Sequence, residues 1–508
     1  MQTSTKVVFN TVILYVKVIT SLAIALISVP LVLKALGASD YGLYNLVAGV
    51  VAMLAFLNNS MTVSSQRYMS VAMGESNNQK INNIYNTSFL LHLGLGLFVV
   101  VVFEIIGLFA IDKLNIVHER MASAQIIYQF LVLSTFAKII SVPFDALINA
   151  KEDMLPLSII ELIDSVLMLT IAFSIAYISG DKLIYYGMCV AAISLLVLLM
   201  KYCWCCHAYN EYKIRLKENR GRYYIKEMLG FTGWNLFGGL AMIGRNQGVA
   251  VIINLFLGTI VNAAYGVANQ INGALGYFST TFQKAINPQL MKSEGMNDRN
   301  RLLRISFISS KFSVLALALF AVPLIIEMDE VLSLWLKDDV PPYTMRLAQF
   351  ILLLSIAYQY SVGIMSAIQA TGKIRNYQIT MGSILLLNVP IAYTILKLGY
   401  PVYYTTMAFL VLEIISLCVR LFMAKHLTGM KINDYYKNVI LPTFVIILIP
   451  MSFAIMIHSI LESSLIRLIA VSLTYGLVFV ALMFRVAFEE NQREVISLKL
   501  KQFLNKQK

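Results

Sequence analysis

The sequence predicts an all-α polytopic membrane protein with about fourteen transmembrane helices, arranged as two six-helix bundles followed by a C-terminal helix pair. Three observations predict this fold: the composition, a series of long apolar stretches, and an internal repeat. Of the 508 residues, 58% are hydrophobic and only 13% are charged, and the mean hydropathy is +0.73. A water-soluble fold cannot bury so much apolar surface in one core, so a bilayer is the expected solvent.

The apolar stretches are long enough to be membrane spans, because about 20 helical residues cross the roughly 30 Å hydrocarbon layer. The expected spans are 10–34, 42–66, 83–111, 123–142, 157–179, 183–203, 229–256, 259–284, 304–326, 345–368, 378–396, 401–420, 438–458 and 467–487. The first stretch is too long for a signal peptide and lacks a small-residue cleavage site. We therefore expect it to be a retained helix.

The basic residues predict the orientation of the chain. Most of the 40 Lys and Arg residues, which give a net charge of +13, fall in alternate loops, with the densest run between Lys201 and Lys226. By the positive-inside rule, both termini and this run are expected in the cytoplasm. The positive charge then faces anionic headgroups, and no nucleic-acid partner is expected.

An internal repeat divides the chain. A shift of 221 positions places Leu36-Gly37 on Leu257-Gly258 and Gly74 on Gly295, and a shift of 220 places Ile148-Asn149-Ala150 on Ile368-Gln369-Ala370. The repeat equates spans 1–6 with spans 7–12, an organisation that is common in transporters. The expected regions are a first bundle over 1–205, a basic cytoplasmic linker over 206–227, a second bundle over 228–425, and two extra helices with a basic tail over 426–508.

Two motifs carry a resemblance to a known family. The segment from Ser28 to Gly49 includes Val29-Pro30-Leu31 and the run from Leu36 to Tyr44, and a second motif is Ala367-Ile368-Gln369-Ala370-Thr371-Gly372-Lys373. With these motifs the chain resembles the multidrug/oligosaccharidyl-lipid/polysaccharide exporter superfamily over nearly its full length. Within that superfamily it looks most like the polysaccharide transporters that act as O-antigen flippases.

This resemblance implies a function. O-antigen flippases move undecaprenyl-pyrophosphate-linked oligosaccharides from the cytoplasmic to the outer leaflet of the bacterial inner membrane by alternating access. The implied role is in polysaccharide and lipopolysaccharide biosynthesis, without a cofactor. The implied partners are the lipid-linked oligosaccharide, membrane lipids and proteins of glycan assembly.

Cations inside predicted spans are candidate substrate contacts, because a charge at the bilayer centre requires a partner or a water-filled cavity. Arg245 lies near the middle of span 7, too far from either end to reach a headgroup, and Asn246 follows it. Lys17 lies about two turns into span 1, the repeat equivalent of span 7. We expect Arg245 and Lys17 to line one cleft; the alternative for Arg245 is a structural ion pair. Lys138 and Lys311, nearer to span ends, are expected to snorkel.

Further donors are expected on the next pair of spans. Arg67 and Lys284 are predicted to end these spans on the cytoplasmic side, with Asn58 and Asn59 nearby. Pyrophosphate is the expected complement, since guanidinium binds phosphate oxygens bidentately and ammonium acts as a point charge. At an effective dielectric constant of about 20, one charge pair at 4 Å is worth roughly 4 kcal/mol, which offsets the insertion cost of one cation.

Acidic residues within spans are candidates for ion coupling. Glu161 and Asp164 share one helical face at a spacing of three, and Glu413 lies in span 12. Each is able to relay a proton or bind sodium, or instead to pair with Lys138 or another cation. The sequence leaves these alternatives open.

Other chemistries are less well supported. Cys203, Cys205, Cys206 and His207 are adjacent on one turn and cannot easily close a tetrahedral metal site, so no metal or role is assigned to them. A multidrug exporter of the same superfamily, driven by a cation gradient, is the main alternative function, but it predicts carboxylates where span 1 has Lys17. A membrane-embedded polysaccharide polymerase or ligase usually needs a large outer loop, and the longest expected here is 327–346. No Walker motif is present, and we do not expect an enzyme.

Overall fold

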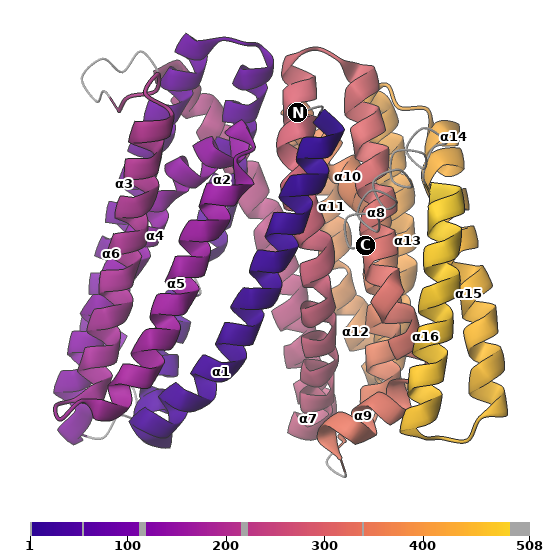
Figure 1. Cartoon of the computed structure of the whole chain (residues 1–508). Coiled ribbons are helices and arrows are strands. Elements are labelled where there is room, and N and C mark those ends of the chain that lie inside the picture. The colour runs from indigo at the N-terminus through magenta and orange to yellow at the C-terminus, as the bar shows by residue number, and fades with distance from the viewer. Residues whose placement is uncertain (1–2, 53–54, 111–117, 215–221, 338–339, 488–508) are drawn as a thin grey trace, which may run out of the picture. The chain divides into compact units, whose positions relative to one another are not determined.

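The computed structural model describes residues 3–52, 55–110, 118–214, 222–337 and 340–487, and these form helices joined by short turns (Figure 1). The helices are α1 (Thr3–Ala52), α2 (Ala55–Gly74), α3 (Asn78–Ala110), α4 (Met121–Lys151), α5 (Met154–Ser174), α6 (Lys182–Ala208), α7 (Arg222–Gly295), α8 (Arg299–Ile326), α9 (Met328–Leu336), α10 (Thr344–Thr371), α11 (Arg375–Leu386), α12 (Asn388–Lys397), α13 (Tyr403–Thr428), α14 (Ile432–Tyr435), α15 (Leu441–Ile460) and α16 (Leu465–Leu482). The predicted all-α class is confirmed.

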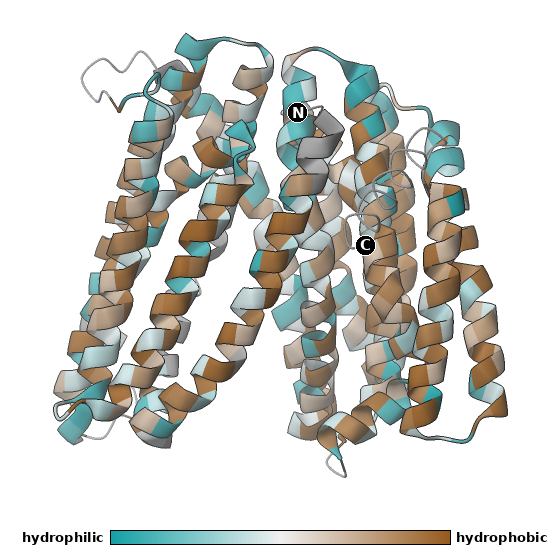
Figure 2. Ribbon diagram, viewed as in Figure 1, coloured by the Kyte–Doolittle hydropathy of each residue, from teal (hydrophilic) through white to brown (hydrophobic). Residues whose placement is uncertain are grey.

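The lengths and compositions of the helices confirm a multi-pass membrane protein. Within the described ranges, twelve helices are long and apolar enough to cross a membrane. Figure 2 shows their middle parts as predominantly hydrophobic and several of their ends as hydrophilic. The long α7 accounts for two predicted spans, because a kink at Gly258 (φ 77°) divides it into two arms that each exceed a bilayer crossing. Predicted span 42–66 runs over α1 and α2, with positions 53 and 54 outside the described residues.

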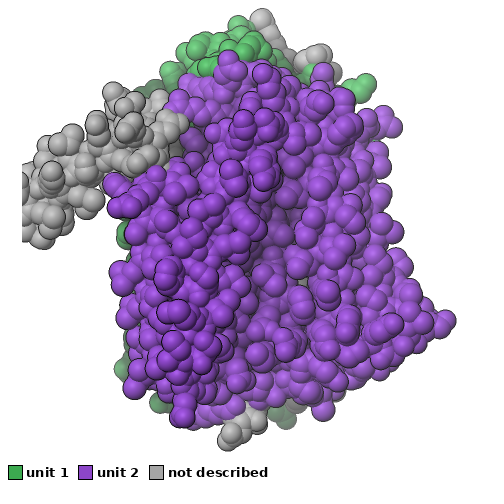
Figure 3. All heavy atoms as spheres, turned by 90° about the vertical axis from the view of Figure 1, so that its right-hand side faces the viewer, with its two compact units in different colours: residues 1–240, 284–298 green, residues 241–283, 299–508 purple. Residues whose placement is uncertain are grey.

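The chain forms two compact units, which Figure 3 colours separately. Unit 1 comprises Met1–Leu240 and Lys284–Asp298, and unit 2 comprises Ala241–Gln283 and Arg299–Lys508. The units therefore divide α7, whereas the sequence analysis assigned all of 228–425 to the second bundle. Each unit has its own apolar cores, one of which joins α2, α3, α4 and α6 around Phe144 in unit 1, and another of which joins α7, α8, α10 and α13 around Leu347 in unit 2.

The first part of the predicted linker packs on unit 1. After α6, the Tyr209 hydroxyl donates to Asp153 (2.6 Å), and Glu211 forms an ion pair with Lys151 (2.6 Å). The carbonyl of Lys213 accepts a hydrogen bond from Asn86 on α3 (2.9 Å). Positions 206–214 are thus attached to the first bundle, and positions 215–221 lie outside the described residues.

Backbone details recur at the spacing of the repeat. The non-helical Gly37 (φ 79°) corresponds to Gly258 (φ 77°), and the left-handed Ser76 (φ 56°) corresponds to Asn297 (φ 55°). The turns also match, since the N–H of Glu75 donates to Val71 (3.0 Å) as that of Met296 donates to Lys292 (2.9 Å). These pairs all differ by 221 positions, so the structure supports the predicted duplication with observations that do not depend on apolar sequence identity.

Two repeat-related glycines meet in unit 1. A Cβ atom added to Gly74 would lie 2.2 Å from the carbonyl oxygen of Lys292, and one added to Gly295 would lie 2.0 Å from that of Val71. Each would also lie 3.1 Å from the Cα atom of the other glycine. The ends of α2 and α7 therefore cross so closely, and so symmetrically, that only glycine fits at either position.

The C-terminal pair α15 and α16 packs on α8 within unit 2, around Ile446, Tyr475 and Phe479. At one end, the fully buried Glu327 pairs with Arg467 (3.0 Å) and His458 (2.7 Å). Lys311 of α8 donates to the carbonyl of Ala487 (2.8 Å), just beyond α16. The expected snorkelling of Lys311 is thus corrected, because a helix C-terminus offers its ammonium a nearer negative partner.

Candidate functional site

A charged cavity of about 300 Å³ lies inside unit 1, between α1, α4, α5 and α6. Its lining combines three ammonium groups, two carboxylates and several hydroxyls: Lys17, Ser21, Lys138, Ser141, Glu161, Asp164, Ser165, Ser194, Val197 and Lys201. The cavity brings together Lys17, predicted as a substrate contact, with Glu161 and Asp164, predicted as ion-coupling residues. Their shared location was not expected from the sequence.

On one side of the cavity α1 is tied to α5. Lys17 forms an ion pair with Glu161 (2.5 Å), and the hydroxyls of Ser21 and Ser165 lie 3.1 Å apart, one turn further along both helices. The side chains of Lys17 and Glu161 remain 21% and 36% exposed, so the pair is in contact with the open space of the cavity. Of the alternatives left open for Glu161, the structure shows pairing, with Lys17 in place of Lys138.

A second ion pair joins α4 to α6. The Lys201 ammonium lies 2.8 Å from Asp145, and its side chain is only 8% exposed. The sequence analysis counted Lys201 among the cytoplasmic loop residues and did not single out Asp145. This ion pair was not predicted: Lys201 lies inside α6, and Asp145 on α4 provides it with a buried partner. The four-residue spacing of Ser141 and Asp145 on α4 was the available signal for a polar face.

Two groups at the cavity remain without a direct ion pair in the described part of the chain. Asp164 on α5 and Lys138 on α4 both line the cavity, and no oppositely charged atom lies within ion-pair distance of either. Lys138 is an exposed side chain that interacts with Asp164 only at longer range. Asp164 is therefore the carboxylate of this cavity that can exchange a proton without disrupting an existing ion pair.

In unit 2, Arg245 stands on the first arm of α7 without a carboxylate partner among the residues that the structure describes. Its Nε–H donates to the side chain of the adjacent Asn246 (3.1 Å), and Asn246 itself is exposed. Tyr265 and Tyr358 are close enough to interact with the Arg245 charge. The half-exposed guanidinium is thus surrounded by amide and phenol groups, and it retains unused N–H donors.

The neighbouring glycines allow α11 and α12 to approach α7 closely. A Cβ atom added to Gly244 would lie 3.3 Å from Leu386, and one added to Gly248 would lie 3.0 Å from Val389. These two glycines flank Arg245 and fix the face of α7 that packs within unit 2. These glycines therefore allow close helix packing beside Arg245.

Glu413 lies in a fully buried ion pair. On α13 its carboxylate is 2.5 Å from Arg420, and these side chains are 4% and 2% exposed. Arg420 also donates to Ser361 on α10 (2.9 Å) and lies over the ring of Tyr358 (5.7 Å). Arg420 lies inside α13, where the seven-residue spacing puts it on the same face as Glu413.

Arg67 and Lys284 were predicted to end their helices, but neither does. Helix α2 continues to Gly74 and α7 to Gly295, because the polar sequence after each residue stays helical up to the glycine crossing. Arg67 is 8% exposed and lies over the rings of Tyr68 (4.6 Å) and Phe231 (5.1 Å). Lys284 is exposed. Their roles in substrate binding remain predictions.

The remaining predicted residues are two asparagines and the cluster of cysteines at the end of α6. The side chains of Asn58 and Asn59 lie outside the described residues. Cys205 is buried, whereas Cys203 and Cys206 are exposed. Among the described residues no group of three or more His, Cys, Asp or Glu side chains is arranged to hold a metal ion.

One network within unit 1 was missed by the sequence analysis. Arg120, before α4, bridges Asp40 on α1 (2.6 Å) and Asp181 before α6 (2.9 Å). Asp181 also accepts hydrogen bonds from Ser123 and from the first backbone N–H groups of α6. Burial favours a higher pKa for Asp181, but these hydrogen bonds and the Arg120 charge outweigh it and lower the pKa. The network gives Asp40, part of the first family-like motif, a structural role.

The overall architecture is that of an integral membrane protein with a duplicated bundle and charged groups inside each unit. No family model matches the sequence, and no curated protein matches it. Solved structures of similar fold are found. A multidrug resistance MATE family transporter of the MOP superfamily, in an outward-facing conformation, has a TM-score of 0.72 at 13% identity and covers 84% of this chain and 95% of its own.

Two further structures agree. A MATE mutant has a TM-score of 0.73 at 14% identity, with 84% of this chain and 97% of that chain covered. A MOP superfamily transporter from Pyrococcus furiosus, described as having a binding pocket of reverse polarity that suggests a different function, has a TM-score of 0.71 at 12% identity, with 84% and 95% covered. The chain therefore has the fold of the MATE transporters of the MOP superfamily. This fold is the one that the motif resemblance implies, and it does not distinguish an O-antigen flippase from a multidrug exporter.

Proposed function

We propose that this protein is a flippase that carries undecaprenyl-pyrophosphate-linked oligosaccharide from the cytoplasmic to the outer leaflet of the bacterial inner membrane by alternating access. The observation that carries the proposal is Arg245, a guanidinium within an apolar span that has no carboxylate partner among the described residues. A cation in such a place is costly unless an anion or water compensates it. Pyrophosphate offers several oxygens in the geometry that guanidinium binds bidentately.

The surroundings of Arg245 fit an anionic headgroup. Asn246 and the phenols of Tyr265 and Tyr358 are neutral hydrogen-bonding groups, so they can contact phosphate oxygens or sugar hydroxyls without repelling the charge. Glu413, which interacts with the same Tyr358, is already compensated by Arg420. The roles of Lys17 and Lys284 in substrate binding stay predictions from the sequence.

The multidrug exporter remains the second candidate, and the MATE-like fold favours it. A cationic drug requires an uncompensated carboxylate, and Asp164 in the unit 1 cavity is one such group. We assign Asp164 instead to proton coupling, because the other two carboxylates, Glu161 and Asp145, already hold ammonium groups. Sodium is a poorer fit than a proton, since a dehydrated sodium ion needs several oxygen ligands away from competing cations. A proton can bind Asp164 without displacing either lysine.

Substitution of Arg245 tests the proposal. Arg245→Ala should insert normally and should reduce glycan export at least tenfold, with lipid-linked oligosaccharide accumulating inside, whereas Arg245→Lys should keep part of the activity because the charge remains. Surface glycan and the extracted lipid-linked precursor are measured in a gene-deleted strain carrying each variant. Gln247→Ala, two residues along the same helix, is the matched control. Full export by abundant Arg245→Ala would contradict the proposal, and loss of drug resistance in place of glycan export would favour the exporter.

A further inference from the structure

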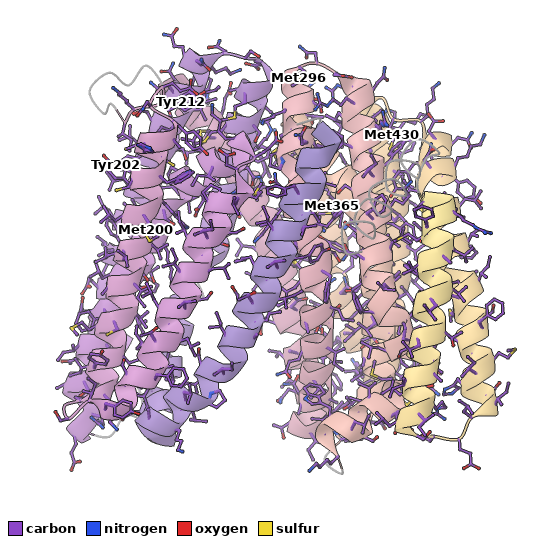
Figure 4. The ribbon with its side chains drawn as sticks, in the orientation of Figure 1. Met200, Tyr202, Tyr212, Met296, Met365 and Met430 are labelled. Atoms are coloured by element: carbon purple, nitrogen blue, oxygen red, sulfur yellow. The ribbon has the colours of Figure 1, made fainter. Side chains whose placement is uncertain are left out.

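The end of α7 belongs to a different unit from the residues on either side of it. We call Lys284–Gly295 the α7 tail. It belongs to unit 1, although the residues before it (up to Gln283) and after it (from Arg299) belong to unit 2. The chain therefore enters unit 1 with the tail and leaves it again through a turn over Met296–Asp298, which lies at the same end as Tyr212 (Figure 4).

Glu152 is the main polar partner of the α7 tail. It follows α4 in a left-handed conformation (φ 63°) and is 4% exposed. Its carboxylate accepts hydrogen bonds from Gln289 and Lys292, one turn apart on the tail. Its backbone carbonyl accepts a further bond from Asn10 on α1 (3.0 Å). One residue thus connects the turn between α4 and α5 to both α1 and the α7 tail.

Apolar and backbone contacts complete the attachment. Ala285 of the tail, which is 1% exposed, is buried together with Leu14 of α1 and Met154 of α5. Further along, Gly295 crosses Gly74 at backbone contact. The tail is therefore held by one buried charged cluster between two close-packed contacts.

The chain connectivity determines what must happen to these contacts during transport. Because both ends of the tail are covalently continuous with unit 2, a motion of unit 2 away from unit 1 pulls the tail with it. Alternating access requires such motions on the side where the substrate enters. The charge bias assigns this end, with Lys292, Arg299 and Lys151, to the cytoplasm.

We propose that Glu152 is the central residue of a latch that holds the α7 tail in unit 1 and that must release before substrate loads from the cytoplasm. The inference rests on the proposed alternating-access transport, but not on the identity of the substrate. Glu152 acts through Lys292 and Gln289 and does not touch the cargo, so it is a positioning residue. The closed latch depends on opposite charges. Removing the ammonium leaves a buried carboxylate without a partner and destabilises the closed state, whereas swapping the two charged residues keeps the ion pair.

The test measures how often the tail detaches, in purified full-length protein in detergent, without substrate. In a cysteine-free background, Ala285→Cys places a thiol on the buried face of the tail. Its rate of reaction with a maleimide reports how often the tail detaches from unit 1. Glu152→Ala and Lys292→Glu should each raise this rate about tenfold or more, because the closed state loses its charge pair. The exchange Glu152→Lys with Lys292→Glu should bring the rate back to within about threefold of the parent.

Two further variants separate the latch from general loosening. Glu211→Ala removes an ion pair with Lys151 at the same end of unit 1 and should leave the labelling rate unchanged. Gly74→Ala forces the crossing apart without altering any charge and should raise the rate. Each variant is first compared with the parent by thermal unfolding, so that a globally unfolded protein is recognised.

Each outcome is decisive. Rates that do not rise in folded Glu152→Ala and Lys292→Glu would overturn the latch, as would a charge exchange that labels as fast as the single variants. A latch that behaves as expected in a protein that exports no glycan would leave the inference standing and remove only the proposed substrate.

Discussion

Each unit contains charged groups within apolar helices, but the two sets differ in hydration. In unit 1, the Lys17–Glu161 pair and Asp164 surround a cavity and stay partly exposed. In unit 2, Glu413 and Arg420 of α13 are buried against α10. The difference lies between these two pairs, since unit 1 also holds the buried Asp145–Lys201 pair and unit 2 the half-exposed Arg245. The partly exposed pair should tolerate the loss of one partner better than the buried pair.

The largest effect is expected from breaking the buried pair in unit 2. Glu413→Ala leaves the Arg420 guanidinium buried without its carboxylate, which should destabilise the protein by about 3–5 kcal/mol. The measurement is the unfolding midpoint in detergent. Glu413→Leu combined with Arg420→Met should recover most of the loss, since no charge is then buried. A single variant as stable as the parent would show that unit 2 is more hydrated than its geometry indicates.

The next effect concerns the pair at the cavity. Glu161→Gln should change stability by less than about 1 kcal/mol, because Lys17 keeps access to the hydrated cavity and exposed pairs contribute little. Transport should nevertheless fall, as Lys17 is no longer held against α5. Thermal unfolding and glycan export, measured on the same preparations, check the two parts. Equal losses in Glu161→Gln and in Glu413→Gln would remove the contrast between the two pairs.

Asp164 sharpens the comparison further, through pH. Asp164→Asn should leave stability nearly unchanged but should make transport in vesicles insensitive to an imposed pH gradient, because the amide cannot take up a proton. Ser165→Ala, on the same helix, is the control and should keep the dependence. A normal pH response in Asp164→Asn would place proton coupling elsewhere.

The smallest effect is expected at Asp181, outside the spans. Its lowered pKa in the folded protein means that it stabilises unit 1 above the pKa of the unfolded chain, and that this contribution is lost as the pH falls through the folded pKa. Asp181→Asn should therefore lower the stability slightly at neutral pH and should reduce the further loss of stability on the acidic side. Unfolding midpoints measured over an acidic pH series test this. An unaltered profile would mean that Arg120 does not hold the Asp181 charge.

The sequence predicted the helices better than it predicted the ionic partners. Length and hydropathy are local properties, so the spans and the repeat were visible, and Glu161, Asp164 and Lys17 were recognised as unusual charges. Their contacts are set by neighbouring helices, and for that reason the Lys17–Glu161 pair was not predicted, whereas the expected cleft of Lys17 with Arg245 stays a prediction. The burial of Arg420 and Lys201 was not predicted, because a sequence does not show which carboxylate on the same or a neighbouring helix will pair with a cation.

The glycine crossing also bears on the ancestry of the chain. If the two halves once existed as separate identical chains, a symmetric dimer of them would have had residues on its two-fold axis that met their own counterparts. A single codon change from glycine to alanine there would have added a methyl group to both sides of the contact at once. After the copies were joined in one gene, positions away from the axis were able to diverge separately, as Lys17 and its repeat counterpart Gly238 have done. Gly74 and Gly295 still carry the restriction of that earlier symmetry.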